Sequence, residues 1–293
     1  MIKIDSENSP FNRKSVLITG SSSGIGRQTA IILAQNGFLV FATVRKESDA
    51  EKLRSLGHQN LMPICPLDLT NLDHIKDTAS FVREELNRRK IEGLFALINN
   101  GGAGMPSPIE LMDLAMFARE LQARLLGSVA MVQSFLDMIR QGNGRIVWIM
   151  TPALIPTPYV ASIHSCDFAV NCLARTLEIE LQRWNIPNIM IKCGGIKTPA
   201  GMRTTLDVES VLKNAPPEKA ELYEKAFRKW SADMADFDKK RTEPEKVAEI
   251  VLKADNARKP KHRYSIGYMS KAAALLEAMP QGMADWILKK RFR

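Results

Sequence analysis

Short apolar runs alternate with longer amphipathic segments along most of the chain. The apolar runs predict buried strands at residues 15–19, 38–44, 61–67, 93–98, 145–150 and 188–192. Between them, apolar positions three and four apart predict helices, one ending near residue 36 and others over about 72–89, 112–140 and 162–184. Strands that alternate with helices form crossover units. The pattern therefore predicts an α/β fold, a doubly wound parallel sheet with helices on both faces.

The segment from residue 198 to about 240 interrupts this alternation. It is polar, charged and helical in its periodicity, and we interpret it as a helical insertion that covers a substrate site. A chain of 293 residues suits one α/β domain. We therefore expect a single domain over residues 1–293, with this insertion and, over about residues 270–293, a basic amphipathic tail.

The amino-acid composition argues against several classes of protein. The chain is 45% hydrophobic and 25% charged, as is usual for a globular protein that buries a full core. It has no apolar run long enough for a membrane span, and its first residues lack the apolar segment of a secretory signal. The four cysteines have neither CxxC nor zinc-finger spacing. We therefore expect reduced thiols, no metal site and a cytoplasmic protein.

The net charge of +9 raises the question of a nucleic-acid partner. Lysine and arginine are spread along the chain without interleaved aromatic residues, which argues against one. The one dense basic cluster is at residues 289–293, and it follows an apolar series from Leu275 to Ile287. This cluster is either a solvated tail or a peripheral contact with a membrane or a protein.

A glycine-rich turn follows the first predicted strand. Residues 19–26 read Thr-Gly-Ser-Ser-Ser-Gly-Ile-Gly and lead directly into a predicted helix. In such a turn, backbone N–H groups and a helix N-terminus bind a pyrophosphate, and a side chain at Gly20, Gly24 or Gly26 would obstruct the turn, the ligand or helix packing. The strand-turn-helix context, more than the glycine spacing alone, predicts a Rossmann-type dinucleotide site.

Further segments extend this pattern. Asp68-Leu69 follows the third predicted strand, Asn99-Asn-Gly-Gly102 follows the fourth, and residues 193–199 read Cys-Gly-Gly-Ile-Lys-Thr-Pro. Together with the glycine turn, these segments resemble the classical short-chain dehydrogenase/reductase family over nearly the whole chain. Residues 243–248 and 259–264 resemble its steroid and retinol dehydrogenase branch.

The resemblance implies a nicotinamide cofactor and the residues that bind it. It places Asp68 at the adenine, Asn99 in the adenosine pocket and Thr198 at the nicotinamide end. The full set of implied cofactor-binding residues at these motifs is Gly20, Ser22, Ser23, Gly24, Ile25, Gly26, Asp68, Leu69, Asn99, Gly101, Gly194, Ile196 and Thr198. The resemblance also implies a homo-oligomer, a dimer or tetramer formed through the two long helices predicted at 112–140 and 162–184.

The end of the second predicted strand bears on the choice of cofactor. Family members that prefer NAD(H) carry an acid there, which binds both ribose hydroxyls. This chain has Val44-Arg45-Lys46 instead, and the guanidinium of Arg45 is suited to a 2′-phosphate. We therefore expect NADP(H), with NAD(H) and a merely solvated basic loop as the alternatives.

The family's catalytic asparagine, serine, tyrosine and lysine have no direct counterpart. The segment 159–162, Tyr-Val-Ala-Ser, resembles the start of Tyr-x-x-x-Lys, but Ile163 would then replace the lysine and the spacing from Thr151 is too short. We favour the alignment that keeps the family spacing to residues 180–181 and 193–194. It places Arg124 at the asparagine, Thr151 (or Met150) at the serine, Ile163 at the tyrosine and Asp167 at the lysine.

These replacements change the chemistry that is expected. Ile163 transfers no proton, and Asp167 would raise the pKa of a nearby phenol, so ordinary alcohol–ketone interconversion is not expected. Tyr159 either reaches the pocket or packs as an ordinary aromatic, and His164, pointing off the active face, is interpreted as a core or surface histidine. Arg124 and Asp167 should lie together, either as a structural salt bridge or as a pair that orients or protonates a substrate. In the second case Asp167 carries the proton, because arginine stays charged.

Two functions fit this pattern. The first is a repurposed reductase of a biosynthetic pathway, which transfers a hydride to a small apolar, pre-activated acceptor such as an imine, iminium or enone. The second is a catalytically inactive NADP(H)-binding protein with a regulatory or scaffolding role. The intact nucleotide motif and the replaced proton relay agree with both.

Overall fold

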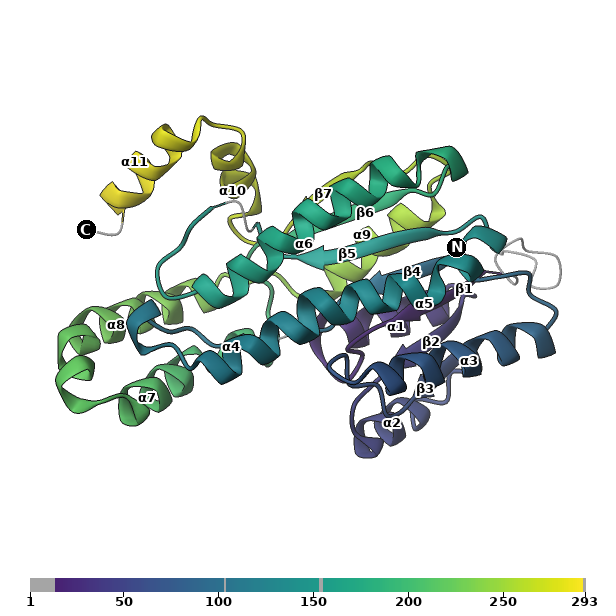
Figure 1. The fold of residues 1–293 in the computed structure, drawn as a ribbon, viewed down its shortest axis with the longest axis horizontal. Coiled ribbons are helices and arrows are strands. Elements are labelled where there is room, and N and C mark those ends of the chain that lie inside the picture. Colours follow the sequence, from purple (N-terminus) through teal and green to yellow (C-terminus); the bar gives the residue numbers. More distant parts are fainter. Residues whose placement is uncertain (1–13, 103, 153–154, 292–293) are drawn as a thin grey trace.

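A parallel β-sheet forms the centre of the molecule (Figure 1). The computed structural model describes residues 14–102, 104–152 and 155–291. Within these residues seven strands pair in the order β3-β2-β1-β4-β5-β6-β7. Their bounds are β1 (Ser15–Ile18), β2 (Leu39–Thr43), β3 (Leu61–Ile64), β4 (Ala96–Asn99), β5 (Arg145–Met150), β6 (Asn188–Cys193) and β7 (Arg263–Ile266). The six predicted strands are confirmed, and β7 adds an edge strand that the apolar pattern did not indicate.

Helices cover both faces of this sheet, as the alternation predicted. One face carries α3 (Leu72–Arg88), α5 (Gly127–Gln141) and α6 (Ala161–Glu180); the other carries α1 (Gly24–Gln35), α2 (Glu47–Arg54) and α9 (Pro244–Asn256). Alternate strand residues enter the two cores: Leu17 packs with the first layer and Val16 with the second. Burial on both faces explains why the strands read as continuous apolar runs.

The helix predicted over 112–140 is divided by a π-helical turn. Its parts are α4 (Leu114–Leu121), the turn η3 (Gln122–Leu126) and α5. The side chain of Asp113 caps α4 by accepting the N–H groups of Ala115 and Met116 at 2.8 and 3.1 Å. A π-helical turn inserts an extra residue into the helical ladder and is frequent at functional sites. Here it carries Arg124.

The polar segment after β6 forms helices beyond the carboxyl ends of the strands (Figure 1). These are η5 (Gly201–Arg203), α7 (Thr204–Asn214) and α8 (Pro217–Asp238). Val211, Phe227 and Trp230 make a small separate core that packs against Met105 and Tyr159. The segment therefore has one apolar face, and that face is directed at the loops that follow β4 and β5.

The last two helices extend past the sheet edge. They are α10 (Ser270–Glu277), which follows β7, and α11 (Gln281–Arg291), which lies at the upper left of Figure 1. On α11 the side chains of Met283 and Trp286 are exposed. The remaining short helices are η2 (Ile109–Leu111) and η4 (Gln182–Trp184). In the described part of the chain, no helix is both long and apolar enough to span a membrane.

Candidate functional site

The glycine turn packs tightly against the loop that follows β4. Gly20 has a φ of +69°, a conformation that L side chains rarely adopt. A Cβ built on Gly26 would lie 2.2 Å from the carbonyl oxygen of Gly20 and 2.5 Å from Asn100 Nδ2. Asn100 holds this arrangement by donating to the carbonyl of Thr19 at 2.9 Å. The turn therefore needs glycine at these positions, as predicted.

The start of α1 is open to an anionic ligand. Its cap residue Ser23 is extended and makes no side-chain cap, and the first turn holds no acidic residue. Ser22 and Ser23 are exposed, whereas Ile25 is partly buried against the core. The first N–H groups of a helix have no partner within the helix and favour negative charge. This end of α1 fits the pyrophosphate of a dinucleotide.

The loops after β3 and β4 bring the other predicted cofactor residues beside this turn. A Cβ on Gly101 would lie 2.8 Å from Leu69 Cδ1, so these two segments touch. Asn99 is 5% exposed, yet its amide nitrogen and oxygen both lack a hydrogen-bond partner within the described residues. A buried amide without partners is costly unless a ligand supplies them. The orphaned Asn99 amide thus fits a bound cofactor.

Asp68 and Arg45 follow the neighbouring strands β3 and β2 and lie close enough for their charges to interact. Burial raises the pKa of Asp68, but hydrogen bonds from Thr70 and the charges of Arg119 and Arg45 outweigh it and hold the pKa below its usual value. The Thr70 hydroxyl donates to Asp68 at 2.8 Å. Arg45 is exposed just after β2 and forms no ion pair with the described residues. Its guanidinium is available for a phosphate.

The loop after β6 closes the other side of the turn. A Cβ on Gly24 would lie 3.0 Å from Thr198 Cγ2, so this loop reaches the glycine turn. Arg241 holds the loop by donating to the carbonyl of Ile196 at 3.2 Å. The Ile196 side chain is buried in the core, and Gly194 packs against the backbone of Tyr268, where a Cβ would come within 2.2 Å of a carbonyl oxygen. Of these three predicted residues, Thr198 lies nearest the turn.

Arg124, Asp167 and Thr151 meet beneath the loop that follows β4. Arg124 from η3 pairs with Asp167 from α6, and their side chains are only 13% and 4% exposed. Thr151, just after β5, donates its backbone N–H and its hydroxyl to Asp167 at 2.7 and 2.8 Å. Met150, the alternative to Thr151, is buried in the core instead. The structure thus brings three predicted residues into one hydrogen-bonded cluster.

Ile163 lies next to this cluster under the same loop. A Cβ on Gly104 would come within 2.2 Å of Ile163 Cγ1, and one on Gly102 within 2.6 Å of Arg124 Cγ. The loop backbone therefore covers both side chains closely. An aliphatic group lies where the favoured alignment places the family's tyrosine, and it contributes no proton.

Glu120, which the sequence did not single out, adds a buried carboxyl group to this place. One oxygen accepts the N–H of Met105 at 3.0 Å. The other, Oε2, is buried without a hydrogen-bond partner among the described residues and faces Gly104, whose Cβ would lie 2.9 Å away. Burial raises the pKa of Glu120, and the nearby Ser162 hydroxyl, the N–H of Met105 and the charge of Arg124 only partly offset this effect. Only the fold of the loop onto α4 distinguishes this glutamate from an ordinary surface residue.

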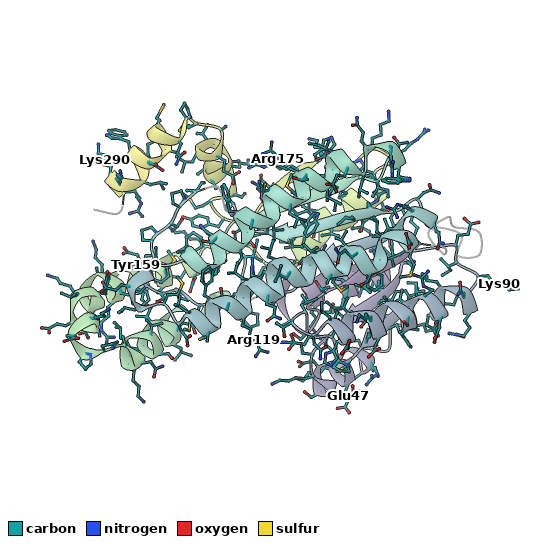
Figure 2. All side chains as sticks on the ribbon, in the orientation of Figure 1. Glu47, Lys90, Arg119, Tyr159, Arg175 and Lys290 are labelled. Carbon is teal, nitrogen blue, oxygen red and sulfur yellow. The ribbon has the colours of Figure 1, made fainter. Side chains whose placement is uncertain are left out.

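Tyr159 and His164 form no hydrogen bond or ion pair with Arg124 or Asp167 among the described contacts. The Tyr159 ring packs 4.8 Å from Phe227 and 5.5 Å from Trp230, at the end of the molecule that carries α7 and α8 (Figure 2). His164 Nδ1 lies 3.0 Å from the carbonyl oxygen of Ile155, and burial lowers its pKa. Both side chains thus have packing partners of their own. The described residues hold no cluster of three metal-ligating side chains.

Comparisons with known proteins agree with this geometry. The sequence profile described as short chain dehydrogenase matches residues 14–209. The chain is 29% identical over 263 residues to a 3-amino-tetrahydro-pyrrolizinone reductase of Xenorhabdus hominickii, a match that covers 88% of each chain. It is 28% identical over 302 residues to estradiol 17-beta-dehydrogenase 2 of Mus musculus, covering 100% of this chain and 78% of the mouse protein.

Solved structures give the same fold at lower identity. A short-chain dehydrogenase from Streptomyces avermitilis matches with a TM-score of 0.74 and 19% identity, covering 98% of this chain and 99% of the other. One from Burkholderia cenocepacia, solved in complex with NADP, matches with a TM-score of 0.71 and 19% identity, covering 96% and 99%. At this level of identity the likeness concerns the fold.

Proposed function

The chain belongs to the short-chain dehydrogenase family, and we propose that it is an atypical NADP(H)-dependent reductase of a small apolar, pre-activated acceptor. The observation that carries the proposal is the Arg124–Asp167–Thr151 cluster beside Ile163. These side chains occupy the places that the favoured alignment gives to the family's proton relay. A site without the tyrosine and lysine needs an acceptor that takes up a hydride without forming an alkoxide.

The cofactor side of the proposal rests on the turn between β1 and α1. The glycine turn and the uncapped start of α1 would bind the pyrophosphate, and the Asn99 amide would gain partners from the adenosine. Arg45 would bind the 2′-phosphate through its guanidinium, which favours NADP(H) over NAD(H). When bound, NADPH supplies the hydride.

In this proposal Glu120 is the acid that donates a proton to the acceptor. Both oxygens of Asp167 already accept hydrogen bonds, from Arg124 and from Thr151. Glu120 has a buried oxygen free of such partners among the described residues, and its raised pKa favours the protonated acid. Donation of this proton to an imine nitrogen would generate the electrophilic iminium carbon, and the carboxylate left behind would stabilise its charge. Arg124 and Asp167 then act as positioning residues.

The helical insertion supplies the apolar wall of the proposed pocket. Phe227 and Trp230 are buried on its inner face and contact Tyr159. In this proposal they cover the acceptor, and Tyr159 shapes the pocket without transferring a proton. The name of the Xenorhabdus relative, 3-amino-tetrahydro-pyrrolizinone reductase, supports a small nitrogen heterocycle as the acceptor.

One observation favours an alternative, a catalytically inactive NADP(H)-binding protein with a regulatory or scaffolding role. The Arg124–Asp167 pair is buried, and both Asp167 oxygens accept hydrogen bonds from Arg124 and Thr151 without a substrate, although Arg124 Nε has no partner among the described residues. A buried ion pair with a satisfied carboxylate can serve structure alone. The two functions share the nucleotide site and differ in turnover.

We further propose a homo-oligomer that acts in the cytoplasm. Large apolar side chains on α4, η3 and α6 are exposed, among them Leu114 (75%), Leu126 (61%) and Phe168 (53%). Burial of this surface between copies would remove it from water. Phe168→Glu should then reduce the mass measured by light scattering to that of one chain.

The exposed Met283 and Trp286 before the basic end of α11 support a peripheral contact of the tail with a membrane or a protein.

The test of the proposed function is NADPH oxidation with a panel of cyclic imines, enones and ketones. The proposal expects turnover with imines and none with simple ketones. Turnover of ketones as fast as of imines would contradict it. Binding of NADPH without oxidation by any acceptor would leave the inactive nucleotide-binding protein as the function.

A further inference from the structure

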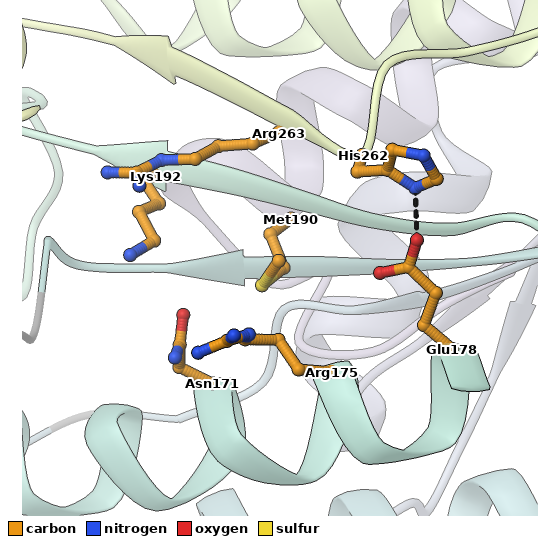
Figure 3. Close-up of a pocket in the computed structure, with 7 residues that line it drawn as sticks. All are labelled: Asn171, Arg175, Glu178, Met190, Lys192, His262 and Arg263. Atoms are coloured by element: carbon orange, nitrogen blue, oxygen red, sulfur yellow. Dashed lines mark ion pairs between the residues drawn. The ribbon is translucent and has the colours of Figure 1, made fainter. Parts of the chain in front are cut away.

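A cavity with several charged side chains in its lining lies between α6 and the strands β6 and β7, on the face of the sheet that α6 covers (Figure 3). Its volume is about 360 Å³. Asn171 and Arg175 reach it from α6, Lys192 from β6 and Arg263 from β7. None of these residues belongs to the glycine turn or to the cluster around Asp167.

Three positive side chains line this cavity, and two of them pair with one buried carboxylate. Lys192 Nζ lies 3.0 Å from an oxygen of Glu277 on α10, and both side chains are almost completely buried. Arg263 pairs with the other oxygen of the same carboxylate. Glu277 can neutralise only one of the two cations. The pKa of Lys192 is lowered to about 8, by burial first and then by the charges of Arg263 and Arg175.

The other charges around the cavity leave one positive charge unmatched, because three cations face the two carboxylates of Glu277 and Glu178. Arg175 is exposed and forms no ion pair with any described residue. Glu178 also lines the cavity and contacts His262, which is charged only when protonated, so Glu178 adds a second negative charge beside that of Glu277 (Figure 3). The cavity therefore keeps an excess of positive charge on rigid elements of the sheet and α6.

Asn171 adds an unused hydrogen-bonding group. It is only 5% exposed, it lines the cavity, and its amide makes no hydrogen bond with the described residues. In Figure 3 its amide lies near the end of the Arg175 side chain and below Lys192. Its amide atoms still reach solvent, so a ligand in the cavity would replace water as their hydrogen-bond partner.

We propose that this cavity binds a small oxyanion, a phosphate or carboxylate group, between Asn171, Arg175, Lys192 and Arg263. An oxyanion accepts several hydrogen bonds at once, and guanidinium groups match its geometry in bidentate pairs. The Asn171 amide nitrogen and the Lys192 ammonium supply further donors. Because Arg175 is exposed, an anion can reach its guanidinium from solvent. The proposal does not depend on the function proposed for the dinucleotide site.

The test is isothermal titration of inorganic phosphate into the full chain at constant ionic strength. NADP⁺ is present throughout, because the Arg45 region is a second predicted phosphate site. We expect saturable binding of one phosphate per chain that weakens about tenfold or more in Arg175→Ala and in Asn171→Ala. Arg258→Ala is the matched control, because Arg258 is exposed and its loss changes the net charge equally. Circular dichroism of each variant checks the fold.

A second arm titrates acetate in competition with phosphate. Competition identifies a general oxyanion site, and its absence identifies a phosphate site; both agree with the proposal. Absence of saturable binding for both anions would overturn it. Equal weakening in Arg175→Ala and Arg258→Ala would overturn it too, because the effect would then be one of overall charge.

Discussion

Thr151 donates two hydrogen bonds to a single oxygen of Asp167, one from its backbone N–H at 2.7 Å and one from its hydroxyl at 2.8 Å. This pairing ties the carboxyl end of β5 to the second turn of α6. The other oxygen of Asp167 accepts from Arg124, so a third element, η3, joins the same point. One carboxylate therefore organises the floor of the proposed acceptor site.

Asp167→Asn should destabilise the protein strongly. An asparagine cannot neutralise Arg124, whose side chain is only 13% exposed, and an unpaired buried charge costs about 3 kcal/mol or more. Urea unfolding of both proteins measures the difference in the free energy of unfolding. Asp73→Asn is the control, since its ion pair with Lys76 is exposed, and it should change stability by less than about 0.5 kcal/mol. Equal, small effects of both substitutions would show that the pair does not organise the site.

Arg45→Ala should weaken NADPH binding and leave NADH binding nearly unchanged. The lost contact is between a guanidinium and a phosphate, so we expect about a tenfold or larger increase in Kd. Fluorescence titration with both nucleotides gives the two constants. Arg83→Ala removes the same charge from the exposed surface of α3 and serves as the control. An equal loss of affinity for NADPH and NADH would show that Arg45 does not determine which of the two cofactors binds.

Gly26→Ala should abolish nucleotide binding. The added methyl group would lie 2.2 Å from the Gly20 carbonyl oxygen, so the turn must open and release the Asn100 contact. Gly282→Ala is the matched control, because a Cβ there meets nothing within 4 Å. Calorimetry with NADPH should find no binding for the first variant and unchanged affinity for the second. Retained affinity in Gly26→Ala would contradict the assignment of this turn to the pyrophosphate.

Glu120→Gln should lower kcat for an imine about a hundredfold without changing the Kd of NADPH, because the amide keeps the contact to Met105 but has no acid proton. In the unsubstituted protein the acid must be protonated, so kcat should fall as pH rises through the raised pKa of Glu120. The variant should lose this limb of the pH profile. Glu84→Gln, on the exposed surface of α3, should behave like the parent. An unchanged kcat in Glu120→Gln would mean that another group donates the proton.

Asp255 should make the stability of the protein depend on pH. It is fully buried on α9, and burial raises its pKa to about 7 despite Arg145 and Lys14. The unfolded value is about 4, so between about pH 4 and 7 the folded state binds more protons than the unfolded state. The contribution of Asp255 to stability is therefore present below pH 4 and is lost as pH rises to 7, by up to about 4 kcal/mol.

Urea unfolding between pH 4 and 8 tests this, as the difference between the parent protein and Asp255→Asn. The difference curve should slope across that window, because asparagine does not titrate. Asp137→Asn, whose side chain is 74% exposed, should give a flat difference curve. A flat curve for Asp255→Asn as well would mean that Asp255 is ionised in the folded protein at these pH values.

The inner strands were predictable because each is buried on both faces and therefore reads as an uninterrupted apolar run. The edge strand β7 was not, since its burial alternates and its sequence Arg-Tyr-Ser-Ile is half polar. The π-helical turn η3 was also missed, because helical periodicity alone does not reveal an extra residue in the ladder. Helix α2 is too short and polar to produce a clear period.

In the site, the meeting of Arg124, Asp167 and Thr151 followed from the spacing of family motifs. Glu120 did not, because its burial depends on the loop through Met105 folding back over α4, which no local pattern encodes. The side-chain direction of Tyr159 was likewise open, since it depends on Phe227 and Trp230, which lie far along the chain. Contacts between distant segments thus mark the boundary of what the sequence could predict here.

The reaction proposed for this chain is hydride transfer from NADPH to a carbon–nitrogen double bond. It is tested by mass spectrometry of the product formed from a cyclic imine with NADPH deuterated at the transferable C4 position. We expect an amine that carries one deuterium at the former imine carbon, and almost none when Glu120→Gln replaces the parent protein. An imine recovered without deuterium, while NADPH remains bound and unoxidised, would contradict it.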